Sequence, residues 1–222
     1  VRKVKYVTVI SGCSRQKLLQ QTGIAPGKVV VIPNCVSFGP EDYQPKLSIN
    51  TKEPVLLQIG TKPNKNLENV IEAIEDLSCR LLIIGKLSET QLSLLKAKGI
   101  IYVNYVQLAY EEVKALYYKS DIVTFISIFE GFGMPILEAN ALGRPVITSN
   151  VSAMPEVAGE GALLVDPYNA GEIREAIETL IFDDKLRSEL VAAGYKNVQR
   201  FRPEEVAAQY EALYSKVIEE NR

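Results

Sequence analysis

Short apolar runs recur along the chain, and many of them are rich in β-branched residues. Near-continuous apolarity is typical of strands covered on both faces, as in a parallel sheet. The runs that this pattern predicts to be strands are Val4–Ile10, Val29–Ile32, Val55–Ile59, Leu81–Ile84, Ile100–Val106, Ile122–Ser127, Pro145–Ser149 and Ala162–Val165.

Between these runs, apolar residues recur three and four positions apart, the spacing of one helix face. Helices are predicted near residues 14–22, 67–77, 88–98, 113–117, 134–142, 169–181 and 203–217. Ser88 begins a capping box, Asn169 is a strong N-cap residue and Gly143 follows the end of a helix. Strands that alternate with helices predict an α/β fold with a doubly wound, Rossmann-like parallel sheet.

One segment, Asn34–Pro54, is rich in proline and glycine and has little periodicity, so we interpret it as a linker. The strand, helix and strand before it are too few for a domain, and Val1 stands where a Met would begin a chain. We therefore expect a cut end and a remnant of an N-terminal domain, with its linker, in residues 1–45. Residues 46–201 then form the main domain and residues 202–222 a C-terminal helix.

Composition excludes several classes of function. The 222 residues carry a net charge of −2 and no histidine, so a histidine-based triad is excluded and wholesale binding of nucleic acid is not expected. The three cysteines form no CxxC pair, so we predict free thiols in a reducing cytoplasm rather than zinc or disulfides. No apolar run is long enough to cross a bilayer, and no secretory signal is visible.

The segment from Ser127 to Glu138 is the strongest candidate for a site, because it follows a predicted strand and opens a predicted helix. Gly131 and Gly133 allow a ligand to approach the backbone, and the helix amides and dipole favour a phosphate. Glu130 precedes the helix and Glu138 lies about one turn inside it. A carboxylate can accept one hydrogen bond from each hydroxyl of a vicinal diol. We therefore predict that the two acids bind opposite ends of one ligand.

Two further loops follow predicted strands. Residues 60–66 contain Lys62 and Lys65, either of which is able to supply a point charge to a diphosphate; a surface turn with solvated lysines is the alternative. Gly85–Lys86 and Asn104–Val106 offer backbone and an aromatic face to a nucleobase, with ordinary loop and core residues as the alternative.

These motifs together resemble retaining GT-B glycosyltransferases of family 4 (glycosyl transferases group 1). Glu130 and Glu138 match the family's EX7E motif. Further matching segments follow in the family's order: Gly143-Arg144-Pro145-Val146, Asn150, Pro155-Glu156-Val157 and Val165-Asp166-Pro167. Residues 60–66 resemble its phosphate loop, and Val31-Ile32-Pro33-Asn34 resembles the end of its N-terminal domain. The resemblance runs over nearly the whole chain.

The resemblance implies a role for each site residue. Glu130 and Lys65 would be the catalytic residues, with Lys65 neutralising the leaving diphosphate. Glu138 would bind the ribose hydroxyls. The remaining donor-binding residues are Gly60, Thr61, Lys62, Tyr105, Val106, Gly131, Phe132, Gly133, Met134, Pro135, Ile136 and Leu137. Thr61 stands where the family usually has an arginine, and the loop is one residue short, so weaker phosphate binding is the alternative to compensation by Lys62. Cys35 replaces the family's usual glycine at the turn into the linker.

The implied reaction is transfer of a hexose from a nucleotide diphosphate sugar to an acceptor hydroxyl, with retention of configuration. No Asp-x-Asp pair is present, so no metal or other cofactor is expected. The acceptor, whether a glycan, a lipid-linked sugar or a small glycoside, would be bound through the missing N-terminal domain. The C-terminal helix would pack across both domains. The chain alone is expected to transfer no sugar.

Alternatives remain at this point. A catalytically inactive nucleotide-sugar-binding or interaction module derived from a transferase is the main one. Epimerases and phosphorylases of related fold are disfavoured because the histidine and pyridoxal-lysine sites they need are not evident. The protein is expected in the cytoplasm, with attachment of the full-length protein to the inner membrane surface left open.

Overall fold

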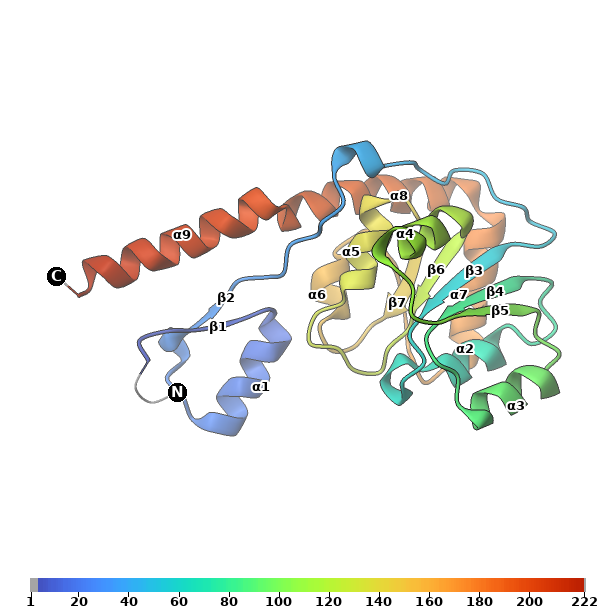
Figure 1. Ribbon diagram of the computed structural model, residues 1–222, viewed down its shortest axis with the longest axis horizontal. Helices are drawn as coiled ribbons and strands as arrows, with labels where there is room; N and C mark the ends of the chain where they lie inside the picture. Colours follow the sequence, from blue (N-terminus) through green and yellow to red (C-terminus); the bar gives the residue numbers. More distant parts are fainter. Residues whose placement is uncertain (1–3, 222) are drawn as a thin grey trace.

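The computed structural model describes residues 4–221. Figure 1 shows a layered α/β body, a smaller unit beside it and a long C-terminal helix that extends over that unit. The strands are β1 (Val7–Val9), β2 (Val29–Val31), β3 (Val55–Ile59), β4 (Arg80–Ile84), β5 (Tyr102–Tyr105), β6 (Ile122–Phe125), β7 (Val146–Ser149) and β8 (Leu163–Val165). The helices are α1 (Gly12–Thr22), α2 (Leu67–Ala73), α3 (Glu89–Ala97), α4 (Tyr110–Lys119), α5 (Met134–Ala141), α6 (Met154–Ala158), α7 (Ala170–Phe182), α8 (Asp184–Val198) and α9 (Pro203–Glu219).

The main sheet has six parallel strands in the order β5-β4-β3-β6-β7-β8. The chain therefore builds outward from β3 in one direction, returns to the middle, and builds outward from β6 in the other. In such a sheet, ligands bind beyond the carboxyl ends of the strands where this reversal occurs. Here that point lies between β3 and β6. The predicted doubly wound parallel sheet is confirmed.

Neighbouring residues of the strands are buried in two separate hydrophobic cores. In β3, Leu56 belongs to the core under α2, α3 and α7, whereas Leu57 belongs to the core under α4, α5 and α6. Ile122 and Val123 of β6 divide in the same way. Because side chains alternate across a strand, both faces of the sheet are covered. This explains the near-continuous apolarity of the strand sequences.

The structure differs from the sequence prediction mainly at two helices. α6 and α8 have no counterpart among the predicted helices. α8 buries Leu190, Val191 and Val198, but Arg187, Gly194 and Asn197 share the same buried face, so its apolar periodicity is interrupted. In addition, α2 ends at Ala73 rather than near Leu77, and Asp76 just beyond it has a left-handed φ of 61°.

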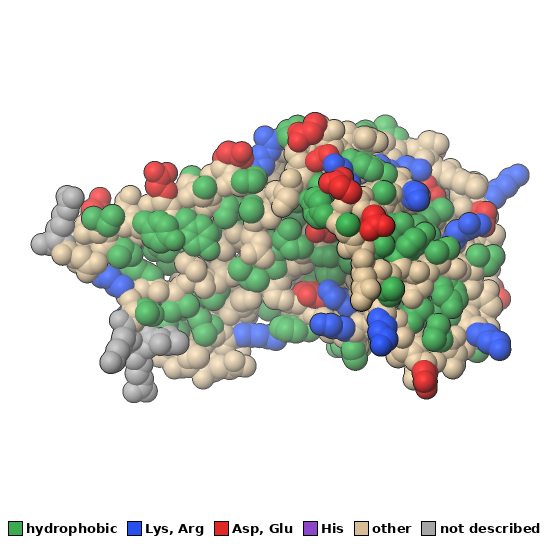
Figure 2. Space-filling view, viewed as in Figure 1, with side chains coloured by type: hydrophobic (Ala, Val, Ile, Leu, Met, Phe, Trp, Pro, Cys, Tyr) green, Lys and Arg blue, Asp and Glu red, His purple; other side chains and the backbone are tan. Residues whose placement is uncertain are grey.

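The leading unit consists of β1, α1 and β2, and its two strands pair in parallel, apart from the main sheet. α9 begins at the main body and its far end contacts this unit: the Tyr6 hydroxyl donates to Glu220 at 2.7 Å, and Lys5 lies 3.3 Å from the same carboxylate. Among the helix's residues only Val206 is buried. Figure 2 shows hydrophobic side chains gathered along this part of the molecule; Tyr214 and Ile218 are exposed. The division into domains stays a prediction.

The three cysteine thiols are free, as predicted: Cys13 lies in α1, Cys35 follows β2, and Cys79 is buried. Burial raises the pKa of the Cys79 thiol to about 11. Within residues 4–221, no helix combines the length and apolarity needed to cross a membrane.

α5 and α8 approach closely because glycine lies at their contact. A Cβ atom at Gly194 would lie 2.5 Å from the Asn140 side-chain nitrogen, and one at Gly161 would lie 2.6 Å from the Gly194 Cα. Asn140 is itself buried and donates to the Gly161 carbonyl at 2.8 Å. It therefore has no room to move aside.

We expect Gly194→Ala to destabilise the chain by about 1–3 kcal/mol, because overpacking at Asn140 outweighs the better helix propensity of alanine. Urea unfolding measures the change. Gly27→Ala is the matched control: a Cβ there meets nothing within 4 Å, so its stability should stay within about 0.5 kcal/mol of the parent chain. Equal stability of the two variants would show that the contact between α5 and α8 is loose.

Candidate functional site

The carboxyl ends of β3 and β6 bring together the two loops that carry the strongest sequence candidates. The loop after β3 contains Lys62 and Lys65, and the loop after β6 contains Glu130 and leads into α5. Figure 2 shows Lys and Arg side chains gathered in the lower middle of the face, where these loops lie beside the leading unit. Strand order, rather than closeness in sequence, creates this site.

Lys65 and Glu130 form an ion pair at the centre of the site. The Lys65 Nζ lies 2.7 Å from Glu130 Oε1, and the two side chains are only 21% and 18% exposed. The Asn64 side-chain nitrogen donates to the same carboxylate oxygen at 3.0 Å and to the Phe129 carbonyl at 3.1 Å. The acid and the cation predicted to be catalytic are therefore in direct contact, and Asn64, which sequence reasoning missed, fixes the acid.

Gly60 and Gln58 explain how Lys65 reaches this position. Gly60 has a φ of 93°, and a Cβ there would lie 2.8 Å from the Lys65 side chain. The aliphatic part of the Lys65 side chain therefore packs directly against the Gly60 backbone, where only glycine leaves room for it. Gln58 is fully buried and donates to the carbonyls of Gly60 and Lys65 at 3.3 and 3.1 Å. It accepts in turn from the Thr124 hydroxyl of β6 at 3.0 Å. A polar residue inside an apolar strand was the signal that could have identified Gln58.

The first turn of α5 presents mainly backbone. Gly133, just before the helix, has a φ of 130°, whereas Gly131 has no left-handed φ, so only the second glycine is required by conformation. Among residues 4–221, nothing accepts a hydrogen bond from the amides of Gly131, Phe132 and Gly133. The side chains of Phe132, Ile136 and Leu137 are buried in the core, and Met134 and Pro135 are half-buried. These residues are therefore placed to bind a ligand through their backbone amides rather than through their side chains.

Glu138 lies one turn inside α5, as predicted, and contacts α4. Its Oε2 accepts from the Tyr117 hydroxyl at 2.5 Å. Burial raises the pKa of the Glu138 carboxyl, and the bond from Tyr117 opposes this in part. Burial, reinforced by the Glu138 charge, raises the pKa of Tyr117 well above its ordinary value, so Tyr117 remains a donor. One carboxylate oxygen is thus fixed by Tyr117, and no other protein donor to the carboxylate is found within residues 4–221.

The third group of candidates borders the same edge of the sheet. The Thr61 hydroxyl donates to the Lys86 carbonyl at 2.7 Å, and the Gly85 amide donates to the Tyr105 carbonyl at 2.8 Å. The structure therefore brings Thr61 beside Gly85 and Tyr105. Lys62 and Val106 are exposed and make no such contact in the described part of the chain. The roles of all these residues stay predictions.

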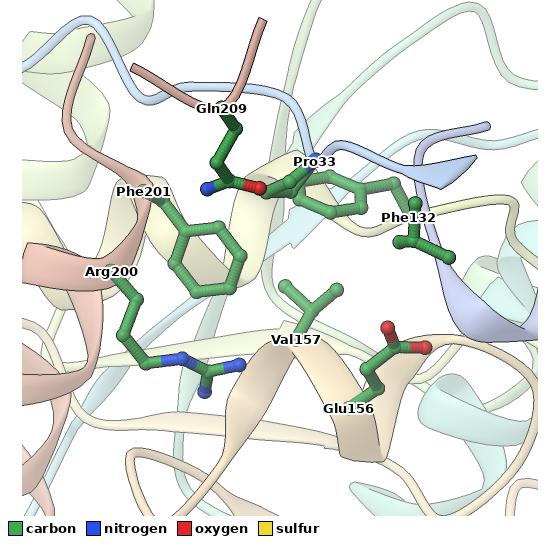
Figure 3. A pocket seen from close by; sticks show the side chains of 8 residues that line it. Pro33, Phe132, Glu156, Val157, Arg200, Phe201 and Gln209 are labelled. Atoms are coloured by element: carbon green, nitrogen blue, oxygen red, sulfur yellow. The ribbon is translucent and has the colours of Figure 1, made fainter. Parts of the chain in front are cut away.

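A cavity of about 290 Å³ lies behind the loop that carries Glu130. Figure 3 shows Glu156 and Arg200 beside Val157, facing Phe132, Phe201, Pro33 and Gln209. Neither Lys65 nor any carboxylate of the EX7E motif lines it. Within residues 4–221, no group of three or more histidine, cysteine or acidic side chains is arranged to hold a metal ion. The metal-free reaction remains a prediction.

Comparison with known proteins shows which family this chain is similar to. The family described as Glycosyl transferases group 1 matches residues 40–197. The O-antigen chain mannosyltransferase B of Escherichia coli is 29% identical, over 92% of this chain and 59% of its own length. The MMP alpha-(1->4)-mannosyltransferase of Mycolicibacterium hassiacum is 26% identical, over 98% of this chain and 55% of its own. The chain thus spans little more than half the length of these relatives.

Solved structures agree in fold. A glycosyltransferase from Rickettsia africae superposes with a TM-score of 0.84 at 23% identity, over 96% of this chain and 64% of that one. HepE from Anabaena, solved in complex with UDP and glucose, gives a TM-score of 0.82 at 20% identity, over 97% of this chain and 64% of that one. These similarities support the Rossmann-like GT-B architecture.

The raised pKa of Glu138 predicts a pH-dependent effect on stability. A carboxyl whose pKa is raised by folding stabilises the fold below its unfolded pKa, and this contribution is lost as pH rises through the folded pKa. Glu138→Gln keeps an acceptor for Tyr117 and removes the buried charge. We therefore expect the variant to have a higher Tm than the parent chain at pH 7.5 and an equal Tm near pH 4.

Scanning calorimetry at the two pH values measures this difference. Glu160→Gln, at an exposed carboxyl, is the control and should not change the Tm at either pH. A lower Tm of Glu138→Gln at pH 7.5 would mean that the charged bond to Tyr117 outweighs burial.

Proposed function

The chain belongs to the glycosyl transferases group 1 family, and we propose that it is the donor-binding part of a glycosyltransferase that uses a nucleotide diphosphate sugar. The observation that carries the proposal is the ion pair between Lys65 and Glu130, 2.7 Å apart at the reversal point of the sheet. A cation, an acid and amides that have no acceptor among residues 4–221 converge there. This combination suits an anionic ligand with hydroxyl groups.

Each part of the site takes a role in this proposal. Lys65 binds the diphosphate and stabilises the charge that develops on it as it departs. The amides of Gly131, Phe132 and Gly133 bind diphosphate and sugar oxygens. Glu130 accepts from hydroxyls of the donor sugar.

The nucleoside occupies the other end of the site. Glu138 accepts from the ribose diol with the oxygen that Tyr117 leaves free. The backbone around Gly85 and the aromatic face of Tyr105 border the base, and Lys62 and Thr61 lie at the loop next to the phosphates. This assigns a nucleotide an extended position along the carboxyl ends of β3, β4 and β6.

The proposed reaction breaks the bond from the anomeric carbon to the diphosphate oxygen and forms a bond to the acceptor oxygen on the same face of the sugar. The diphosphate leaves with the bonding electron pair, and the acceptor hydroxyl gives up its proton. We also propose retention of configuration and membership of family 4, because Glu130 and Glu138 resemble that family's EX7E motif. A lysine and helix amides stabilise the leaving group, so the proposal needs no metal ion or other cofactor.

The names of the relatives suggest the substrates to test first. Two of them are called mannosyltransferases, which favours a hexose donor. Because this chain spans 59% and 55% of their lengths, we assign the acceptor site to a part of the whole protein outside residues 46–201. A glycan, a lipid-linked sugar or a small glycoside would bind there, and the complete enzyme would work in the cytoplasm or at the inner membrane surface.

One observation favours a second candidate, a nucleotide-sugar-binding module without activity. Glu130 already neutralises Lys65, and the hydroxyl of Thr61, which stands at the family's arginine position, is bonded to the Lys86 carbonyl. A neutral side chain then stands where the family has its second cation, and Lys65 is already paired. Donor binding without sugar transfer by the whole protein, across the donors that bind, would identify such a module.

Nucleotide binding tests the proposal directly. We expect calorimetric titration with UDP, GDP and ADP, free and sugar-linked, to give binding of one base series at micromolar to millimolar concentration. Glu138→Ala should weaken that binding about tenfold or more, because a charge-assisted pair of hydrogen bonds to ribose is lost. Glu160→Ala is the control. Absence of binding by every nucleotide in the series contradicts the proposal.

Substitution of either partner of the ion pair should change affinity for the nucleoside diphosphate in opposite directions. Lys65→Met removes the cation and should weaken binding about tenfold or more. Glu130→Gln removes both a negative charge and the competitor for Lys65, and should strengthen binding about threefold to tenfold. Lys52→Met, at an exposed linker position, should leave affinity unchanged. Weaker binding by Glu130→Gln would show that the carboxylate does not compete with the phosphates.

A further inference from the structure

The first turn of α1 lies against the loop that carries Glu130. Ser11 is fully buried, and its hydroxyl donates to the carbonyl oxygen of Gly131 at 2.7 Å. The Ser14 hydroxyl donates to the same oxygen at 3.1 Å. A carbonyl oxygen has two lone pairs and can accept both bonds. Two serines of the leading unit therefore hold one carbonyl of a loop 120 residues further along the chain.

The preceding carbonyl is held from the main body. The Ser152 hydroxyl donates to the Glu130 carbonyl at 2.7 Å and accepts from the Glu130 amide at 3.3 Å. Ser152 has a left-handed φ of 60°, which residues other than glycine rarely adopt. Backbone strain of this kind is found where the surrounding structure requires it. Two consecutive carbonyls of the loop are thus fixed by side chains.

Because the peptide group is planar, these contacts determine the direction in which the Gly131 and Phe132 amides point. None of the described peptide bonds is cis, and the carbonyl and amide of a trans peptide point in opposite directions. Fixing the Glu130 carbonyl therefore directs the Gly131 amide away from Ser152. Fixing the Gly131 carbonyl directs the Phe132 amide away from α1. These two amides are among those without an acceptor in the described chain.

The leading unit is itself anchored at this point. Both carboxylate oxygens of Glu156, at the start of α6, accept from the Gly12 amide at 2.9 Å. The Lys17 Nζ lies 3.5 Å from the centre of the Phe129 ring. Contacts at Gly12 and Lys17, close to Ser11 and Ser14 in the chain, thus hold α1 against α6 and against the loop.

We propose that Ser11, Ser14 and Ser152 are positioning residues that aim the Gly131 and Phe132 amides at the diphosphate and sugar of the bound donor. This inference rests on the proposed function. None of the three serines touches the donor; each acts through a carbonyl that it holds. The leading unit therefore completes the donor site, and moving it away from the main body releases the Phe132 amide.

The first test is the double variant Ser11→Ala/Ser14→Ala, titrated with the sugar nucleotide that the parent chain binds and with the matching nucleoside monophosphate. The monophosphate lacks the sugar and the β-phosphate and serves as an internal reference. We expect about a tenfold loss of affinity for the sugar nucleotide and less than a twofold loss for the monophosphate. Equal losses for both ligands, or no loss, would overturn the inference.

Loss of the helix cap needs its own control, because Ser11 also accepts from the Ser14 amide at the start of α1. Gly23→Ala weakens the other end of α1, where the glycine has a φ of 61°. It should leave both affinities unchanged. A loss as large as that of the double variant would assign the effect to α1 stability and contradict the proposal. Ser14→Ala alone keeps the cap and replaces the double variant if that variant does not fold.

Ser152→Gly provides an independent test in the main body. Glycine removes the hydroxyl and relieves the left-handed φ, so thermal stability should not fall. The expected result is again a selective loss of affinity for the sugar nucleotide. Unchanged affinity at unchanged stability would remove Ser152 from the positioning group.

A measurement without ligand separates this inference from the proposed function. In the parent chain, the backbone ¹⁵N heteronuclear NOE of Gly131 and Phe132 should match that of the sheet, and it should fall in the double variant and in Ser152→Gly. If no nucleotide binds to the parent chain, the proposed function fails. Unchanged NOE values in the variants overturn the positioning role whether or not a nucleotide binds.

Discussion

Lys65 and Glu130 lie on loops that follow two different strands, and their charged atoms are 2.7 Å apart with about a fifth of each side chain exposed. Neither charge could be left alone in such surroundings without a large desolvation penalty. Their pairing requires β3 and β6 to be neighbours, as the register Leu56↔Ile122 and Leu57↔Val123 makes them. It also requires Gly60, whose missing side chain gives the lysine stem its path. The site is therefore a consequence of strand order at the middle of the sheet.

Around this pair, the polar groups of the loops are fixed before any ligand arrives. Gln58 is buried in the central strand and holds two carbonyls of the lysine loop, and Asn64 joins that loop to Glu130. Tyr117 fixes one oxygen of Glu138. Dipoles that are already oriented need no reorganisation when charge develops, which is the main way in which proteins stabilise such charge. Gln58, although buried in the sheet, thus supports the site through these hydrogen bonds.

The leading unit has a larger part in this arrangement than its size suggests. Its helix begins with two serines against the Gly131 carbonyl and with an amide against Glu156. The far end of α9 returns to the same unit through Glu220. The leading unit is therefore held by the far end of α9 through Glu220 and by the loop that leads into α5 through Ser11 and Ser14.

The sequence by itself determined the strands, most helices and the placing of both acids relative to α5, because these depend on spacing within one element. Glu138 lies one turn inside the helix whatever surrounds it. Of the two missed helices, α6 has only five residues, and the buried face of α8 mixes apolar residues with Arg187, Gly194 and Asn197. Only the tertiary structure decided that Lys65 meets Glu130, that Tyr117 meets Glu138 and that Ser11 meets Gly131. These partners are 65, 21 and 120 residues apart. Local periodicity carries no information on which loops become neighbours, since strand order is settled by the packing of the whole sheet.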